Sequence, residues 1–119
     1  MTKLKWIRSE KRMLGFWNEV KKLEGKTLKT LDRGNTFIIL VVSDYGVIVK
    51  PLATDKEWLV PRSEIEGAYR ELFSNKEITR ALIESKYSPR NPVYIAAILA
   101  ELPGVWYTIR PIHLRLESE

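Results

Sequence analysis

Hydrophobic and polar positions change period along this chain of 119 residues, and the changes divide it into three parts. In the first part, residues 1–25, a basic leader is followed by apolar residues at helical spacing. Ser9 can cap this helix, and Gly25 can end it. The pattern predicts an amphipathic N-terminal helix whose apolar stripe is Met13, Phe16, Trp17, Val20 and Leu23.

The second part, residues 26–61, changes to a period of two. The stretches "KTLKTL", "TFIILVVS", "VIVKPL" and "EWLVP" have the composition of strands, and "DRGN", "DYG" and "ATDK" are turn sequences that use Gly34 and Gly46. They predict a four-stranded antiparallel meander or half-barrel. Because Phe37 to Val42 is apolar on both faces, we expect that strand to be central and covered on both sides.

The third part, residues 62–119, predicts three helices followed by one or two strands from "VWYTIRPIHLRLE". Ser63 and Glu66 have the spacing of a capping box, and Thr79 can cap a short second helix. The third helix begins with Asn91 as a cap and Pro92 in its first position, and it ends near Gly104. The apolar stripe of the first of these helices is Ile65, Ala68, Tyr69, Leu72 and Phe73.

The third helix carries small apolar residues where an exposed face would carry Lys and Glu: Val93, Ala96, Ala97 and Ala100. A helix that is apolar all round is normally buried, so the sequence favours packing of these alanines against the sheet or against a second chain. The alternative is a smooth exposed face that allows close approach to a partner.

Length and composition predict one domain, residues 1–119, of the α+β class. The sequence contains no cysteine, no apolar run long enough to span a bilayer, and no signal-peptide pattern at its start. We therefore expect a cytoplasmic protein without a membrane partner.

The strand pattern of residues 25–52 resembles that of small SH3-like barrels, and the order of elements in residues 63–116 resembles that of winged-helix modules. The second resemblance implies that the third helix enters the major groove of DNA and that its N-terminal residues make the contacts. The residues that it implies are Arg90, Asn91, Tyr94 and, on the following strand, Arg110. The helix departs from the usual pattern because it has few polar residues beyond its first turn and has Glu101 near its end.

The net charge of +5 is unevenly distributed, because residues 1–33 carry +6 and the remainder carries −1. Such an asymmetry is typical of proteins whose partner is negatively charged, nucleic acid above all. The leader and first helix contribute the candidate phosphate contacts Lys3, Lys5, Arg8, Lys11 and Arg12. A solvated basic surface without a partner is the alternative.

No motif predicts catalysis, a metal site or a cofactor. His113 is the only histidine and fits a surface or partly buried strand position, and no two acidic residues have the spacing of an acid/base pair. Trp58 and Trp106 fit either the core or an exposed strand face where bases stack, and Trp6 lies in the basic leader.

Two functions remain open on this reasoning. The first is a non-enzymatic nucleic-acid-binding protein, DNA ahead of RNA, whose binding depends mainly on phosphates and little on base sequence. The second is a protein-interaction or assembly module, including a homodimer, that uses the alanine-rich face of the third helix or the tryptophans.

Overall fold

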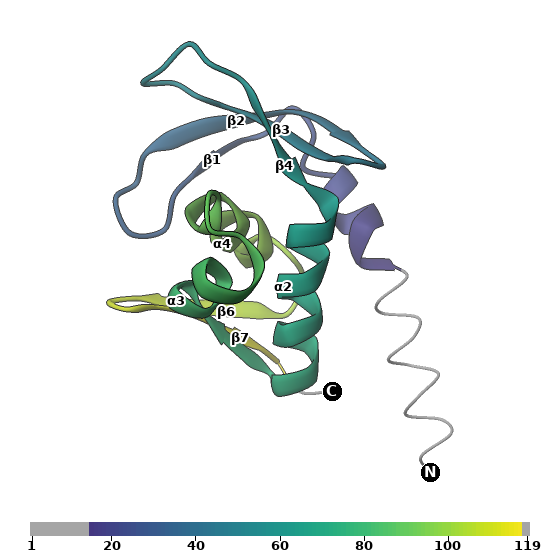
Figure 1. Ribbon diagram of the computed structural model, residues 1–119, viewed down its shortest axis with the longest axis vertical. Helices are drawn as coiled ribbons and strands as arrows, with labels where there is room; N and C mark the ends of the chain where they lie inside the picture. The colour runs from purple at the N-terminus through teal and green to yellow at the C-terminus, as the bar shows by residue number, and fades with distance from the viewer. Residues whose placement is uncertain (1–14, 118–119) are drawn as a thin grey trace.

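Two antiparallel sheets lie on opposite sides of a layer of helices in the computed structural model, which describes residues 15–117 (Figure 1). The first sheet contains four strands in the order β1-β2-β3-β4, and the second contains three in the order β5-β7-β6. Helix α4 lies between the sheets, and α2 runs beside it from the end of β4 (Figure 1). This arrangement confirms the predicted α+β class.

The first sheet is a meander whose strands follow the predicted stretches closely. Its strands are β1 (Thr27–Lys29), β2 (Thr36–Ser43), β3 (Gly46–Pro51) and β4 (Trp58–Pro61). Gly46 begins β3 with φ +150°, and a Cβ added there would lie 2.2 Å from the carbonyl oxygen of Val60. This position therefore requires glycine, as the turn pattern predicts.

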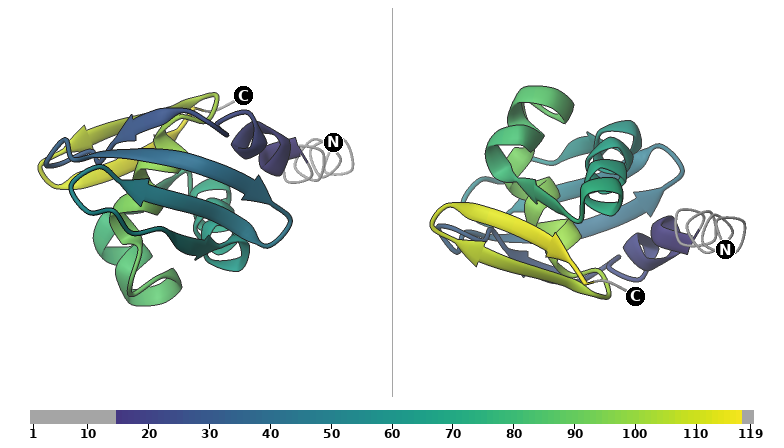
Figure 2. Two further views of the ribbon diagram at one scale, coloured as in Figure 1. Left: turned by 90° about the horizontal axis from the view of Figure 1, so that it is seen from above. Right: turned by 90° about the horizontal axis from the view of Figure 1, so that it is seen from below.

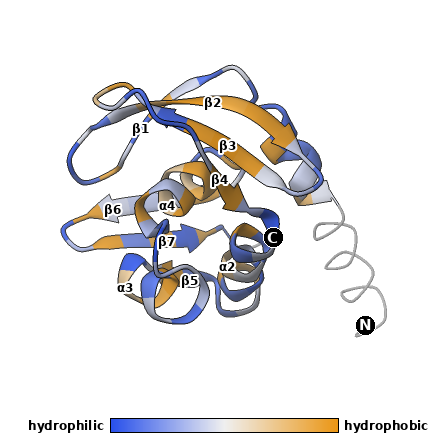
Figure 3. Cartoon of the chain, turned by 45° about the horizontal axis from the view of Figure 1, so that its top comes forward, coloured by the Kyte–Doolittle hydropathy of each residue, from blue (hydrophilic) through white to orange (hydrophobic). Residues whose placement is uncertain are grey.

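The expectation that β2 is covered on both sides is wrong. Phe37 and Ile39 point into the core, but on the outer face Val41 is 43% exposed. Beside it the same face carries Ile48 of β3 and Leu59 of β4, which is 45% exposed. Figure 3 shows the hydrophobic colouring that runs along β2 and β3. A strand that is apolar on both faces has the same sequence pattern whether or not another layer packs on its outer face. The sequence therefore could not show that this face is exposed to solvent.

Helix α2 (Arg62–Asn75) directly continues β4 and buries the predicted stripe, with Phe73 half-buried at its edge. The capping-box prediction is wrong: the helix begins two residues earlier than a Ser63 cap implies, its N-cap is Pro61, and no side chain caps it. Glu66 instead accepts from Arg62 on one side and Arg70 on the other. The helix ends at Asn75, and its C-cap Lys76 has a left-handed φ of 65°.

The segment after α2 forms one element that the sequence did not predict. β5 (Glu77–Thr79) pairs with β7 (Ile112–Leu116), which in turn pairs with β6 (Val105–Ile109). Thr79 caps α3 (Arg80–Leu82) as predicted, since its Oγ1 accepts from the Leu82 amide at 3.1 Å. A π-helix, η1 (Ile83–Tyr87), continues from α3 and leads toward α4 (Pro92–Ala100).

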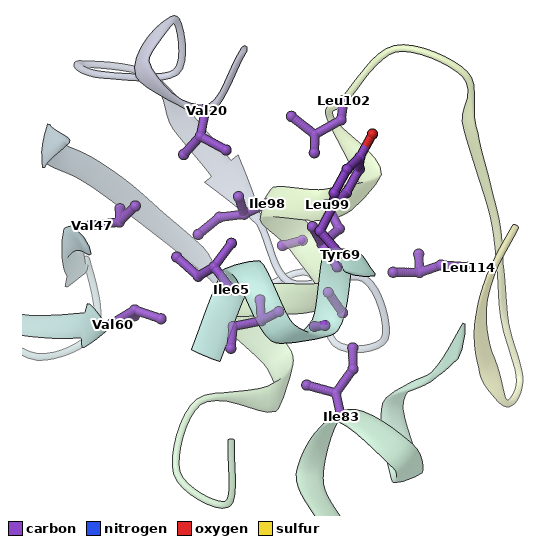
Figure 4. Close-up of a cluster of buried hydrophobic side chains, with 14 of the residues drawn as sticks. Val20, Val47, Val60, Ile65, Tyr69, Ile83, Ile98, Leu99, Leu102 and Leu114 are labelled. Carbon is purple, nitrogen blue, oxygen red and sulfur yellow. The ribbon is translucent and has the colours of Figure 1, made fainter. Parts of the chain in front are cut away.

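Helix α4 occupies the centre of the core. Ile95, Ile98 and Leu99 are fully buried, and so are Ala96 at 0% and Ala97 at 2% exposure. The close-up in Figure 4 shows Ile98 and Leu99 among side chains from α2, β3, β4 and β7. The alanines are small because the two sheets and α2 close around this helix, so packing against the chain itself is the correct alternative.

The N-terminal helix is described from residue 15 to residue 21, and it packs where β2 meets α2. The ring of Phe16 stacks on that of Tyr69 with centroids 4.5 Å apart, and Trp17 donates from Nε1 to the carbonyl oxygen of Ser43 at 3.2 Å. Gly25 follows with φ +83°, in agreement with the predicted stop. Ser9 and Met13 lie outside the described residues.

Candidate nucleic-acid interface

The residues that the winged-helix resemblance implies at the start of α4 are not gathered on the surface. Asn91 is 7% exposed, and its backbone N–H donates to Oγ of the buried Ser88 at 3.1 Å. Tyr94 is half-buried, with its ring edge-on to Phe37 at 4.9 Å and to Trp58 at 5.4 Å. Burial raises the pKa of the Tyr94 phenol. Groove insertion by α4 is therefore wrong for this fold, because its faces lie in the core.

The two predicted arginines of that set are exposed. Arg90 precedes α4, and Arg110 lies in the turn between β6 and β7. Within residues 15–117 neither forms an ion pair, and no hydrogen bond links one to the other. The predicted N-terminal contacts Lys3, Lys5, Arg8, Lys11 and Arg12 lie outside the described residues.

Ion pairs engage much of the positive charge elsewhere. Lys22 bonds Glu19 at 2.8 Å and Lys50 approaches Asp55 at 3.1 Å, for example, while Arg80 bonds Glu84 at 2.9 Å. The described cations without an ion pair are Lys26, Lys29, Arg33, Lys56, Lys76, Arg90, Arg110 and Arg115. These side chains are the ones that can contact an anionic ligand without breaking an existing pair.

Two of these arginines belong to turns that flank one groove. The β1–β2 connection, which carries Arg33, and the β6–β7 turn, which carries Arg110, lie at the same end of the molecule (Figure 2). Between them is a cavity of about 530 Å³, which we call the hairpin-end groove. Its lining includes Asp32, Arg33, Thr79, Arg80, Ile109 and Ile112. The groove therefore combines guanidinium groups with an aliphatic wall.

The strand that leads into this groove exposes aromatic side chains. Trp106 on β6 is 65% exposed, and Tyr107 is 51% exposed. The register places Trp106 opposite Arg115 of β7, so both lie on the outer face of the second sheet. On the same face Thr108 lies opposite His113, whose Nε2 is 2.6 Å from Glu77 Oε1. Of the two tryptophans predicted for core or strand face, Trp106 is exposed and Trp58 packs on Tyr94.

A second hollow, of about 480 Å³, lies at the start of α2 and is mostly charged. Arg62 lies 3.9 Å from Asp44 and 3.2 Å from Glu66, and Arg70 also bonds Glu66 at 3.1 Å. Its charges thus neutralise one another, which leaves no uncompensated charge to select an anionic or cationic ligand. It is a weaker candidate than the hairpin-end groove.

A cluster around Glu71 connects α2 to η1. The hydroxyl of Tyr87 donates to Glu71 at 2.5 Å and Lys86 bonds the same oxygen at 3.2 Å. The Tyr87 hydrogen bond, followed by that of Lys86, lowers the pKa of Glu71. Burial and the bond to Glu71 raise the pKa of Tyr87. Because each group is satisfied by another, this cluster stabilises the fold and offers no free group for catalysis.

Neither a metal cluster nor a membrane span is found in the described part of the chain. No three His, Asp or Glu side chains among residues 15–117 are grouped to hold a metal ion. Of the described helices, none has the length and apolar character to cross a bilayer.

Sequence reasoning missed Arg33 and Arg80 as part of a site. Arg33 was hidden in a stretch assigned only as a turn, "DRGN", and Arg80 follows the helix cap Thr79. An arginine at the tip of a predicted hairpin was the available signal for Arg33. Arg80 lies near Ile109 because β5, which was not predicted, pairs with β7, whereas Arg33 comes from the β1–β2 connection of the other sheet.

No family model matches the sequence, and comparison with curated proteins and with solved structures gives no match. The likeness to SH3-like barrels and winged-helix modules stays a prediction.

Proposed function

We propose that this chain is a non-enzymatic protein that binds single-stranded nucleic acid, DNA ahead of RNA, across the hairpin-end groove and the adjoining strand β6. The observation that carries the proposal is a combination of three groups: Arg33 lines the groove, Arg110 lies in the β6–β7 turn beside it, and Trp106 is exposed on the strand that leads into this turn. Neither arginine has an ion pair among residues 15–117. Exposed rings beside cations are how proteins hold unpaired bases without reading their sequence.

Each group has a definite role in the proposal. Arg33 and Arg110 contact phosphates, because guanidinium groups pair with phosphate oxygens and these two have no carboxylate partner within residues 15–117. A base stacks on Trp106, whose neighbour across the strands, Arg115, supplies a further cation on the same face. Ile109 and Ile112 lie on the opposite face of this sheet from Trp106, where they form the aliphatic wall of the groove. A strand that contacts both the Trp106 ring and this wall therefore passes over the β6–β7 turn, which carries Arg110.

Single strands are favoured over duplex for a geometric reason. A stacking ring must reach the face of a base, which a duplex covers on both sides. The elements exposed here are a strand and two turns, and the helix that a winged-helix module would insert is buried. A single strand at this site is therefore held by stacking and phosphate contacts, and no helix reads bases in a groove of DNA.

The test is fluorescence anisotropy of labelled dT and rU oligomers of about 12 nucleotides, with a duplex of the same length as comparison. We expect the single strands to bind more tightly, with dT ahead of rU, and affinity to fall steeply between about 50 and about 200 mM salt. Arg33→Ala and Arg110→Ala should each reduce the slope of log affinity against log salt by about 0.7. Trp106→Ala should weaken binding about 5- to 150-fold.

Matched controls separate these effects from general charge and aromatic content. Lys56→Ala removes an exposed cation that has no described ion pair, and Tyr45→Ala removes a ring that is 82% exposed on the β2–β3 turn. Both should leave binding unchanged. Absence of binding to every probe at low salt, or equal losses in the controls and in the site variants, would overturn the proposal.

A further inference from the structure

The open edge of strand β6 lacks every protection that the other exposed edges of this molecule have. β1 has three residues, follows Lys26 and ends with Lys29, whereas β4 has four residues and ends at Pro61. β5 has three residues and carries Glu77. β6 has five residues with no charge, no proline and no shift of register. An unprotected edge of this kind presents free N–H and C=O groups as a template to which another strand can add.

The backbone hydrogen bonds define which groups of β6 point outward. The Glu117 amide donates to the Gly104 carbonyl at 2.8 Å, toward β6, while the Leu116 amide donates to Lys76 on the β5 side at 2.9 Å. Because bonded and non-bonded pairs alternate in an antiparallel ladder, Tyr107 and Ile109 direct their backbone groups to the open edge. Tyr107 lies at the middle of the strand.

The charges at the two ends of the second sheet are complementary to a second copy of the same edge. In an antiparallel pairing centred on Tyr107, Gly104 of one copy lies opposite Arg110 of the other. Glu117 is the neighbour of Gly104 on β7, so it shares this row. Two strand spacings of about 4.8 Å separate Glu117 from the opposing Arg110. Glycine has no side chain to fill the gap, and these two long side chains can meet over it, once at each end.

We infer that two copies of this chain associate through their β6 edges, paired antiparallel about Tyr107 into a continuous six-stranded sheet with reciprocal Arg110–Glu117 ion pairs. The outer face, with Trp106 and Arg115, stays open in this arrangement. Trp106 of one copy lies diagonal to Trp106 of the other, at about 7–8 Å. Self-association thus doubles the aromatic face, although it does not depend on nucleic-acid binding.

Sedimentation velocity without nucleic acid, from low to high micromolar concentration, tests the inference. We expect a monomer–dimer equilibrium for the native chain. Arg110→Glu and Glu117→Arg should each raise the dimer dissociation constant about tenfold, because each turns two attractive contacts into repulsive ones. The double variant should recover to within about threefold of the native value. Lys56→Glu, on the β3–β4 connection, should have no effect.

A second pair of variants tests the backbone itself. Tyr107→Pro removes the outward amide and should abolish the dimer, while Tyr107→Ala keeps the amide and should retain a weaker dimer. Circular dichroism of both variants checks that the fold is intact. A monomer at all concentrations, or a dimer that responds neither to the charge exchange nor to Tyr107→Pro, would overturn the inference. The assay contains no nucleic acid, so its result is read separately from the anisotropy test. Arg110 can pair with Glu117 of a second copy or with phosphate, and not with both at once.

Discussion

Tyr94 provides the sharpest test of where α4 lies, because the winged-helix resemblance and the structure assign it opposite roles. As a DNA contact it would be dispensable for folding. In the structure its ring meets Phe37 of β2 and Trp58 of β4, with interplanar angles of 80° and 71°. Tyr94→Ala should therefore destabilise the protein and leave the proposed nucleic-acid interface intact.

The magnitude follows from these contacts. Each edge-on aromatic pair contributes about 0.5–1.5 kcal/mol, so loss of two costs about 1–3 kcal/mol. Removal of the buried part of the half-buried ring adds about 1 kcal/mol. The free energy of unfolding should fall by about 2–4 kcal/mol, a large share of the roughly 5–15 kcal/mol of a typical domain. For a domain of this size the melting temperature should fall by roughly 6–20 °C.

Urea unfolding followed by circular dichroism measures this loss, and oligomer anisotropy on the folded variant measures binding. Tyr45→Ala is the matched control, since that ring is 82% exposed and should change the unfolding free energy by less than about 0.5 kcal/mol. A Tyr94→Ala variant of native stability with weakened binding would refute the buried placement of α4. Loss of stability with binding retained supports it.

Two further predictions concern groups in the core and between the helices. Ala97→Glu should prevent folding, because it places an unpaired carboxylate at a 2% exposed site at a cost of several kcal/mol, whereas Ala53→Glu in an exposed connection should fold normally by circular dichroism. The lowered pKa of Glu71 means that its stabilisation is complete above its ordinary value of 4.5 and is lost as pH falls through the folded-state pKa. Glu71→Gln lacks this contribution, so urea midpoints measured between neutral pH and about pH 3 should decline less steeply than in the native chain; an equal decline would contradict the assignment.

Most helices and strands of this chain could be predicted from the sequence, because they depend on patterns of neighbouring residues. The strands of the first sheet, the stripe of α2 and the Thr79 cap each follow from side-chain period and turn chemistry. β5 was not predicted, because three residues carry no period and gain strand character only from pairing with β7. The position of α4 was left open for the same reason, since burial of Ala97 depends on elements distant in sequence.

The candidate site was predicted less well than the fold. Arg110 was identified from its position on the strand after the third helix, but Asn91 and Tyr94 came from a resemblance that assumed an exposed helix. Arg33 joins Ile109 and Ile112 only through tertiary folding. A site built from turns of two separate sheets leaves no spacing in the sequence that could reveal it.

The central position of α4 has a consequence for how the molecule opens. Residues 95–99 of this helix are each at most 2% exposed, and the helix contacts α2 and strands of both sheets. Water can reach its amide protons only when those layers separate, which removes most of the core at once. The amides of residues 95–99 should therefore exchange with solvent deuterium at the rate set by global unfolding, and their protection would report the stability of the entire domain.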